Sequence, residues 1–110
     1  MIRIGVIGAG HWGPNYVRNF RELDAAQMVN VADPRADARA TLQQRFPDLK
    51  LYEDYRELLD EGEIDGVVVA TPASTHHEIG MACLQAGKHV LIEKPLANSA
   101  AAALELAQYP

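Results

Sequence analysis

Short aliphatic runs alternate with segments of helical periodicity along the whole chain. Five runs have the length of strands; the first is nearly continuously apolar, as expected of a central strand covered on both faces, and the fourth is expected to be deeply buried. They are Ile2–Ile7, Met28–Ala32, Leu49–Tyr52, Val67–Ala70 and His89–Ile92. Strands of this kind, separated by helices, are typical of βαβ units in a parallel sheet.

The segments after these runs predict five helices. Their apolar stripes and start signals are Trp12-Tyr16-Phe20-Leu23, Ala38-Leu42-Phe46, Asp54 with Glu57, Ile79-Ala82-Cys83-Ala86, and an alanine-rich stretch opened by Asn98 or Ser99. Pro47 and Gly87 are expected to stop the second and the fourth helix. We therefore expect an α/β fold in one domain, residues 1–110: a doubly wound parallel sheet of about five strands, with helices on both faces.

Composition and net charge exclude some classes of function for this chain. Of the 110 residues, 48% are hydrophobic and 23% are charged, as in ordinary globular domains. The net charge of −5 argues against a nucleic-acid partner. No apolar run approaches the roughly 20 residues that cross a membrane, so we expect no membrane partner. The chain enters a strand at Ile2 without a signal-peptide pattern and has one cysteine, Cys83, which indicates a reduced, cytoplasmic protein.

The loop after the first predicted strand carries a phosphate-binding pattern. Gly8, Gly10 and Gly13 match G-x-G-x-x-G between a strand and an amphipathic helix. The glycines allow a tight turn, close approach of a pyrophosphate and close packing of helix and strand. The N–H groups of His11 and Trp12 would lie near the helix start, where an anion is favoured. This context predicts a dinucleotide-binding Rossmann fold.

Asp33 lies 20 residues beyond Gly13, at the end of the second predicted strand. A carboxylate there can accept the hydroxyls of the adenosine ribose and would repel a 2′-phosphate. The alternative is that Asp33 only forms a turn with Pro34. Arg35 could pair with a 2′-phosphate. The pattern thus favours NAD as the cofactor and leaves NADP open.

Three segments together resemble the glucose–fructose oxidoreductase and inositol dehydrogenase family (Gfo/Idh/MocA type). They are the run from Ile4 to Gly13, the run Val69-Ala70-Thr71-Pro72 with His76, and the run from Ala86 to Pro95, which contains Gly-Lys-His-Val and Glu-Lys-Pro. The resemblance covers essentially the whole chain. The residues around His11 to Asn15 also look like members that act on nucleotide sugars.

The resemblance implies roles for individual residues. Gly8, Gly10 and Gly13 would hold the pyrophosphate, and Asp33 would hold the ribose. The cofactor would be bordered by Ala70, Thr71, Pro72 and His76, with Glu93 and Lys94 near the nicotinamide. Lys94 would be catalytic, helping proton transfer at the substrate hydroxyl. Relatives often have Asn two positions after the Thr, whereas Ala73 stands here, so that amide contact is lost.

Other polar groups are weaker candidates. His76, His77 and Glu78 are adjacent and would point in different directions on a helix, so we expect no metal site. They fit a polar helix start, with His76 turned inward. Cys83 falls on an apolar stripe and is expected to be an inert core thiol. The acidic residues between Asp54 and Glu63 are expected to form a solvated face.

The resemblance also implies a second domain that supplies substrate contacts, and the chain ends where a sixth strand would ordinarily follow. We therefore expect the NAD(H)-binding half of an oxidoreductase that acts on a sugar or sugar-nucleotide hydroxyl, with the substrate domain missing or separate. The alternative is a free-standing NAD-binding module for sensing or assembly. Because the fifth predicted strand would be a sheet edge, a homo-oligomer is also expected.

Overall fold

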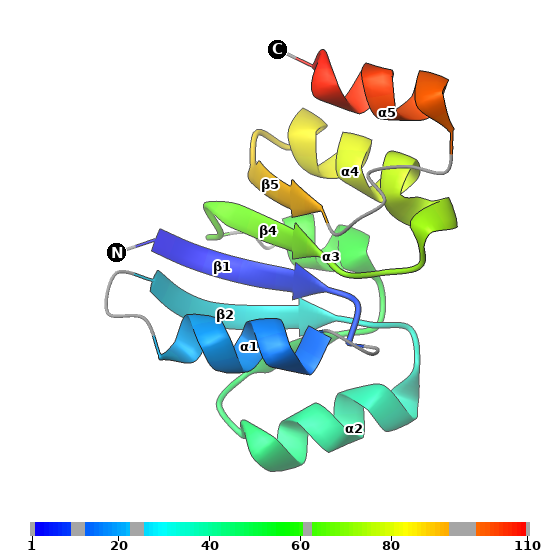
Figure 1. Ribbon diagram of the computed structural model, residues 1–110. Coiled ribbons are helices and arrows are strands. Elements are labelled where there is room, and N and C mark those ends of the chain that lie inside the picture. Colours follow the sequence, from blue (N-terminus) through cyan, green and yellow to red (C-terminus); the bar gives the residue numbers. More distant parts are fainter. Residues whose placement is uncertain (1, 10–12, 23–25, 61–62, 93–98, 110) are drawn as a thin grey trace.

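The computed structural model describes residues 2–9, 13–22, 26–60, 63–92 and 99–109. Strands and helices alternate along the chain, as the sequence predicts (Figure 1). In chain order the elements are β1 (Ile2–Ile7), α1 (Gly13–Arg21), β2 (Ala26–Ala32), α2 (Ala36–Arg45), β3 (Lys50–Tyr52), α3 (Tyr55–Asp60), β4 (Gly66–Val69), the 3₁₀ turn η1 (Ala73–Thr75), α4 (His76–Gln85), β5 (His89–Ile92) and α5 (Ala100–Ala107).

The five strands form one parallel sheet in the order β3-β2-β1-β4-β5. Strand β1 lies at the centre, which explains why the run from Ile4 to Ile7 is buried on both faces. The chain adds strands first on one side of β1 and then on the other. This reversal defines the doubly wound Rossmann fold, and the predicted fold class is confirmed.

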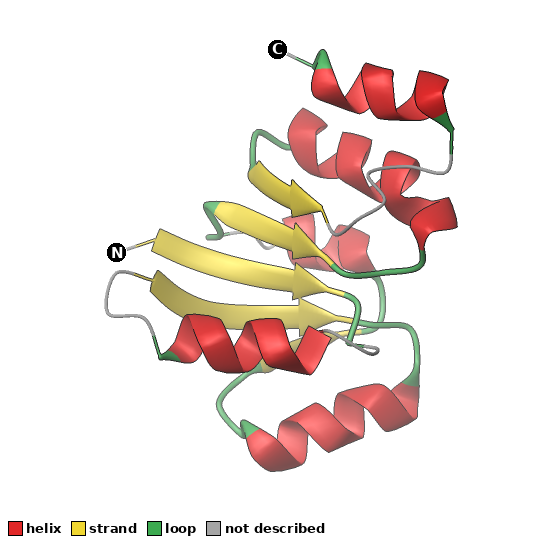
Figure 2. Cartoon of the chain, in the orientation of Figure 1, coloured by secondary structure: helices red, strands yellow, loops and turns green. Residues whose placement is uncertain are grey.

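Helices cover both faces of the sheet (Figure 2). On one face, Val6, Val31 and Val68 pack with Val17 of α1 and Leu42 of α2. Residues that alternate with these strand positions point to the other face, where α3 and α4 contribute Leu58, Ile79 and Cys83. The alternation follows from strand geometry, because successive side chains point to opposite faces.

The helix stripes were predicted only in part. In α1, Tyr16 and Phe20 are half-buried against the core, but the fully buried residue is Val17, which the predicted stripe omitted. Trp12 and Leu23, the two ends of that stripe, lie outside the described residues. In α2, Leu42 is buried and Phe46 follows the last helical residue, in agreement with a stop at Pro47.

Side-chain caps begin two helices where the sequence predicted them. The Oδ1 of Asp54 accepts a hydrogen bond from the N–H of Arg56 at 2.9 Å, at the start of α3. Ser99 caps α5, since its hydroxyl accepts from the N–H of Ala102 at 3.1 Å. Asn98, the alternative cap, lies outside the described residues. Both caps satisfy backbone donors that the helix leaves unpaired.

The carboxyl ends of the central strands meet at one edge of the sheet. Gly8 donates its N–H to the carbonyl of Ala32 at 2.8 Å, and Ala70 donates to the carbonyl of Ile7 at 2.8 Å. These bonds continue the strand ladders by one residue beyond β1 and β4. The loops that follow β1, β2 and β4 therefore start side by side, at the edge where open α/β sheets bind their ligands.

Candidate functional site

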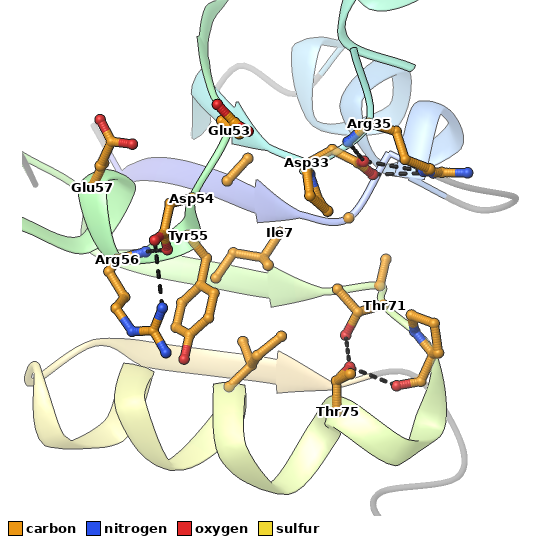
Figure 3. A pocket seen from close by; sticks show the side chains of 16 residues that line it. Ile7, Asp33, Arg35, Glu53, Asp54, Tyr55, Arg56, Glu57, Thr71 and Thr75 are labelled. Atoms are coloured by element: carbon orange, nitrogen blue, oxygen red, sulfur yellow. Dashed lines mark hydrogen bonds and ion pairs between the residues drawn. The ribbon is translucent and has the colours of Figure 1, made fainter. Parts of the chain in front are cut away.

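A cleft of about 1070 Å³ opens at the carboxyl ends of the strands (Figure 3). This volume is slightly above the range of about 300–1,000 Å³ found for small-molecule sites. Loops after β1, β2, β3 and β4 and the start of α4 provide its walls. The lining residues are Ile7, Gly8, Ala32, Asp33, Pro34, Arg35, Glu53, Asp54, Tyr55, Arg56, Glu57, Ala70, Thr71, Pro72, Thr75 and Ile79.

Gly8 adopts a backbone conformation that a larger residue could not share. Its φ is +100°, in the left-handed region that favours glycine. A Cβ atom at this position would lie 2.7 Å from the carbonyl oxygen of Ala70 and 2.9 Å from Cγ2 of Thr71. The first glycine of the motif therefore serves two purposes. It turns the chain after β1, and it lets the end of β4 approach closely.

Asp33 connects the glycine loop to the loop after β2. Its side chain is only 3% exposed, and its Oδ2 accepts a hydrogen bond from the N–H of Ala9 at 2.7 Å. Oδ1 accepts from the N–H of Arg35 at 2.8 Å. The guanidinium of Arg35 closes the arrangement, donating from Nε to Oδ1 and from Nη2 to Oδ2, both at 3.1 Å.

These hydrogen bonds keep Asp33 ionised. Burial acts to raise the pKa of its carboxyl, but the hydrogen bonds from the Arg35 side chain and from the backbone N–H groups of Ala9 and Arg35 outweigh burial. The pKa of Asp33 therefore lies below its usual value. The hydrogen bonds to Asp33 raise the pKa of Arg35 in turn, so both partners are charged at neutral pH.

The loop after β4 forms the opposite wall and is held by its own polar groups. The Thr75 hydroxyl bridges to the hydroxyl of Thr71 and the carbonyl of Pro72, each at 2.7 Å (Figure 3). On the buried side, Nε2 of His76 lies 2.7 Å from the carbonyl oxygen of Thr71. Hydrogen bonds within the loop thus define its shape.

The structure brings several predicted site residues together at the cleft: Gly8, Asp33, Arg35, Ala70, Thr71 and Pro72. His76, which was expected to turn inward and border the cofactor, is buried, at 1% exposed, but it lies behind the loop and not among the residues that line the cleft. Gly13 is the first residue of α1. The remaining predicted site residues, Gly10, His11, Trp12, Glu93 and Lys94, lie outside the described part of the chain.

One wall of the cleft was not anticipated. Glu53, Tyr55 and Glu57 line it, from the loop after β3 and the start of α3. Glu57 is exposed, in agreement with the predicted solvated acidic face, but it also belongs to the cleft, as does the exposed Glu53, which precedes that predicted face. Burial raises the pKa of the Tyr55 hydroxyl. The position of these residues directly after a predicted parallel strand was the signal that could have identified them.

Within residues 2–9, 13–22, 26–60, 63–92 and 99–109, no group of three or more potential ligands could hold a metal ion. In the same ranges no helix is long and apolar enough to cross a membrane. Cys83 is buried, and burial raises the pKa of its thiol to about 12, as expected for an inert core thiol.

The geometry fits a dinucleotide at this edge of the sheet. The cradle at Gly8 has no space for a Cβ atom, so the backbone itself forms the floor. Asp33 supplies a buried carboxylate beside that floor, at the end of the neighbouring strand. A backbone cradle for phosphate beside a carboxylate for ribose is the pairing that dinucleotide sites use.

Comparison with known proteins agrees with this assignment. A family model described as "Oxidoreductase family, NAD-binding Rossmann fold" matches residues 2–109. The chain is 37% identical over 95 residues to myo-inositol 2-dehydrogenase of Thermotoga maritima, which covers 86% of this chain and 28% of that enzyme. It spans between 28% and 32% of the length of the first three curated relatives it matches.

Two solved structures illustrate the range of similar proteins. A biliverdin reductase from Synechocystis, in complex with biliverdin and NADP⁺, has a TM-score of 0.92 and 31% identity, over 98% of this chain and 34% of that one. The WlbA dehydrogenase from Bordetella pertussis, in complex with NADH and UDP-GlcNAcA, has a TM-score of 0.91 and 25% identity, over 98% of this chain and 33% of that one.

Proposed function

Because the chain belongs to the oxidoreductase family with an NAD-binding Rossmann fold, we propose that it is the cofactor-binding domain, residues 1–110, of a sugar or sugar-nucleotide dehydrogenase. The substrate class rests on the similar proteins, which include an inositol dehydrogenase and a structure holding NADH with UDP-GlcNAcA. The chain spans about three tenths of such relatives, so substrate choice is assigned to a further domain.

One observation carries the cofactor part of the proposal. The N–H of Ala9, in the glycine loop, donates to the carboxylate of Asp33 at 2.7 Å. This contact joins the two halves of the dinucleotide motif, although 24 residues separate them in the sequence. A turn-forming aspartate alone, the alternative considered from the sequence, would not require a link to the glycine loop.

The proposed roles rest on position for the described residues and on the family motifs for Gly10, His11, Trp12, Glu93 and Lys94. Gly8, Gly10, His11, Trp12 and Gly13 would hold the pyrophosphate. Asp33 would hold the adenosine ribose, and Arg35 would hold the 2′-phosphate when NADP is bound. Ala70, Thr71 and Pro72 would border the cofactor on the opposite side of the cleft. His76 would act indirectly, by shaping the loop at Thr71. The bound nicotinamide would supply the hydride acceptor or donor. Glu93 and Lys94 are proposed beside it, with Lys94 moving the proton of the substrate hydroxyl.

The choice of dinucleotide, the cellular location and the self-association of the domain are also proposed. The cofactor is NAD, with NADP as a second candidate, since structures similar to this one hold either dinucleotide. A cytoplasmic location is proposed from the single cysteine. Self-association is proposed through the β5 side of the sheet, where Leu91 is 54% exposed.

The cofactor assignment is tested by titrating the chain with NADH. Calorimetry measures the heat of binding, and the fluorescence emission of Trp12 provides a second readout. The Gly8→Ala variant is expected to weaken NADH binding by at least about tenfold, because the added methyl group meets the carbonyl of Ala70. The same change should cost about 2 kcal/mol of stability, since alanine is strained at this φ.

Gly87→Ala is the matched control. Gly87 also has a positive φ, +78°, but a Cβ atom there would meet nothing within 4 Å. This glycine follows α4, at the opposite edge of the sheet from the cleft. The control should share the backbone strain and keep NADH affinity. If NADH gives no heat of binding with the parent chain, the cofactor assignment is refuted. Equal NADH affinities of Gly8→Ala and Gly87→Ala would refute it as well.

A further inference from the structure

The carboxylate of Asp33 has no acceptor position left for a ligand in this conformation. A carboxylate offers about four lone-pair positions to hydrogen-bond donors. Asp33 receives four N–H groups: the backbone N–H of Ala9, the backbone N–H of Arg35, and Nε and Nη2 of the Arg35 side chain. A ribose diol can bind Asp33 only if it replaces two of these donors.

Only two of the four donors can be replaced without unfolding the loops. The N–H groups of Ala9 and Arg35 belong to the backbone that shapes the site. The side chain of Arg35, in contrast, is 57% exposed while the carboxylate beneath it is 3% exposed. Figure 3 shows the Arg35 side chain beside the carboxylate of Asp33, joined to it by hydrogen bonds, and the exposed fractions place the guanidinium on the more solvent-accessible side. The guanidinium and the two hydroxyls of a ribose each present a pair of donors to the same pair of oxygens.

A ribose 2′-phosphate has different requirements. It brings negative charge and acceptor oxygens, so it cannot replace the guanidinium on the carboxylate and would be repelled by a bare Asp33. With Arg35 in place, the carboxylate is neutralised. A guanidinium has five N–H donors, of which this ion pair uses two, so three remain for a phosphate above it.

The surrounding charges do not decide between the two cofactors by themselves. Arg39 donates Nη1 to the backbone carbonyl of Asp33 at 2.8 Å and adds a second positive charge. Asp37 adds a negative charge to the same turn of α2, and its Oδ1 accepts the N–H of Ala38 at 2.9 Å. Two carboxylates and two guanidiniums therefore lie between residues 33 and 39, beside the cleft, and their charges balance. The position of the exposed Arg35 side chain can then change the charge that a ligand meets at Asp33.

We propose that Arg35 is the residue that sets cofactor choice in this site. On Asp33, it shields the carboxylate and offers its free N–H groups to the 2′-phosphate of NADP(H). For NAD(H), it must leave Asp33, and the ribose hydroxyls take its two positions. The docked arginine thus lowers the affinity for NAD(H) and makes the site competent for both dinucleotides. This inference rests on the proposed function as a dinucleotide site.

Calorimetric titration of NAD⁺ and NADP⁺ into the Arg35→Ala variant tests the inference. Removal of the guanidinium should tighten NAD⁺ binding by a factor of about 3 to 10, because nothing then competes for Asp33. It should weaken NADP⁺ binding by at least about tenfold, because a charge-assisted partner of the phosphate is lost and the carboxylate is unshielded. The two affinities must therefore move in opposite directions.

Arg45→Ala is the matched control, since it removes the same charge from the far end of α2, where Arg45 lies over the ring of Phe46. Its ratio of NAD⁺ to NADP⁺ affinity should equal that of the parent chain. Equal weakening of both dinucleotides in Arg35→Ala would overturn the inference, because it would mean that Arg35 only supports the loop. If the parent chain binds neither dinucleotide, the proposed function fails, and the inference fails with it.

Discussion

Asp33 joins the loop after β2 to the loop after β1, two of the loops that form the cleft. It lies at the end of β2, yet it accepts a hydrogen bond from Ala9 in the loop after β1. A buried carboxylate without partners would be costly, and here the donors of Ala9 and Arg35 compensate for the lost water. The ionised form is therefore the stable one, and stability must depend on pH.

The sign of that dependence follows from the lowered pKa of Asp33. The folded chain holds the carboxylate more firmly ionised than the unfolded chain, so the stabilisation is complete above the ordinary pKa of about 3.9. It is lost as the pH falls below that value through the folded-state pKa. In urea unfolding, Asp33→Asn should be less stable than the parent chain at pH 7, and the difference should shrink toward pH 3.

Asp48→Asn is the control for this prediction. The hydrogen bond from Arg21 also lowers the pKa of Asp48, but that side chain is 66% exposed. Exposed ion pairs contribute little to stability, so the pH-dependent difference should be much smaller than for Asp33. A difference between Asp33→Asn and the parent chain that stays constant from pH 7 to pH 3 would contradict the assigned ionisation.

The packing of Gly5 against the buried side chain of Asn30 could not be predicted from the pattern of residues. Asn30 lies in β2 between Val29 and Val31 and is 4% exposed, and its Oδ1 has no hydrogen-bond partner among the described residues. A Cβ atom on Gly5 would lie 2.5 Å from that oxygen. Gly5 therefore makes room for Asn30 where the register between β1 and β2 shifts. The glycine looked like a strand residue in the sequence, and only the neighbouring strand explains it.

At the scale of elements, α5 is attached to the domain through α4. A Cβ atom on Gly80 of α4 would lie 2.8 Å from Cδ1 of Ile92 and 3.0 Å from Cδ2 of Leu106. The absence of a side chain at Gly80 thus lets β5 and α5 pack closely on α4. Leu106 is 5% exposed and is the buried residue of α5.

Leu106→Ala is expected to destabilise the fold by about 3 kcal/mol, the usual cost of removing a buried leucine side chain. Leu104→Ala, on the same helix but 56% exposed, should change the free energy of unfolding by less than about 0.5 kcal/mol. Urea unfolding measures both. Hydrogen exchange should show that α5 loses protection first in Leu106→Ala. Equal costs for the two leucines would refute the packing of α5 on α4.

At the scale of the whole molecule, the β5 side of the sheet is incompletely covered. A shallow groove of about 190 Å³ runs over β4 and β5 and is lined by apolar residues that include Phe20, Val68 and Leu91. Leu91 is 54% exposed, and β5 pairs only with β4 in the described sheet. Exposed apolar surface beside a strand edge favours association.

We expect light scattering of the parent chain to give the mass of a dimer or a larger species. Leu91→Lys should shift that mass toward the monomer, because a charge would be buried at the interface. Leu104→Lys places the same charge on another exposed leucine, on α5, and should leave the mass unchanged. A monomeric mass for the parent chain at all concentrations would disprove self-association through this surface.

The elements could be predicted because their signals are local. Runs of aliphatic residues, a capping aspartate before α3 and a serine before α5 act within a few residues, and the structure has the strands and helices in the predicted order. The stripe of α1 was incomplete for a physical reason. Burial of Val17 depends on which face of the helix meets the sheet, and the spacing of the aromatic residues does not determine that face.

The sequence by itself determined the fold class, the glycine motif and the identity of Asp33 as its partner, because spacing rules between a strand, a turn and a carboxylate express local geometry. Only the tertiary structure decided that the guanidinium of Arg35 binds the carboxylate of Asp33, that His76 lies behind the loop after β4, and that residues after β3 complete the cleft. Those facts depend on how side chains from separate strands compete for the same atoms. Such competition arises only once the sheet has brought the strand ends together.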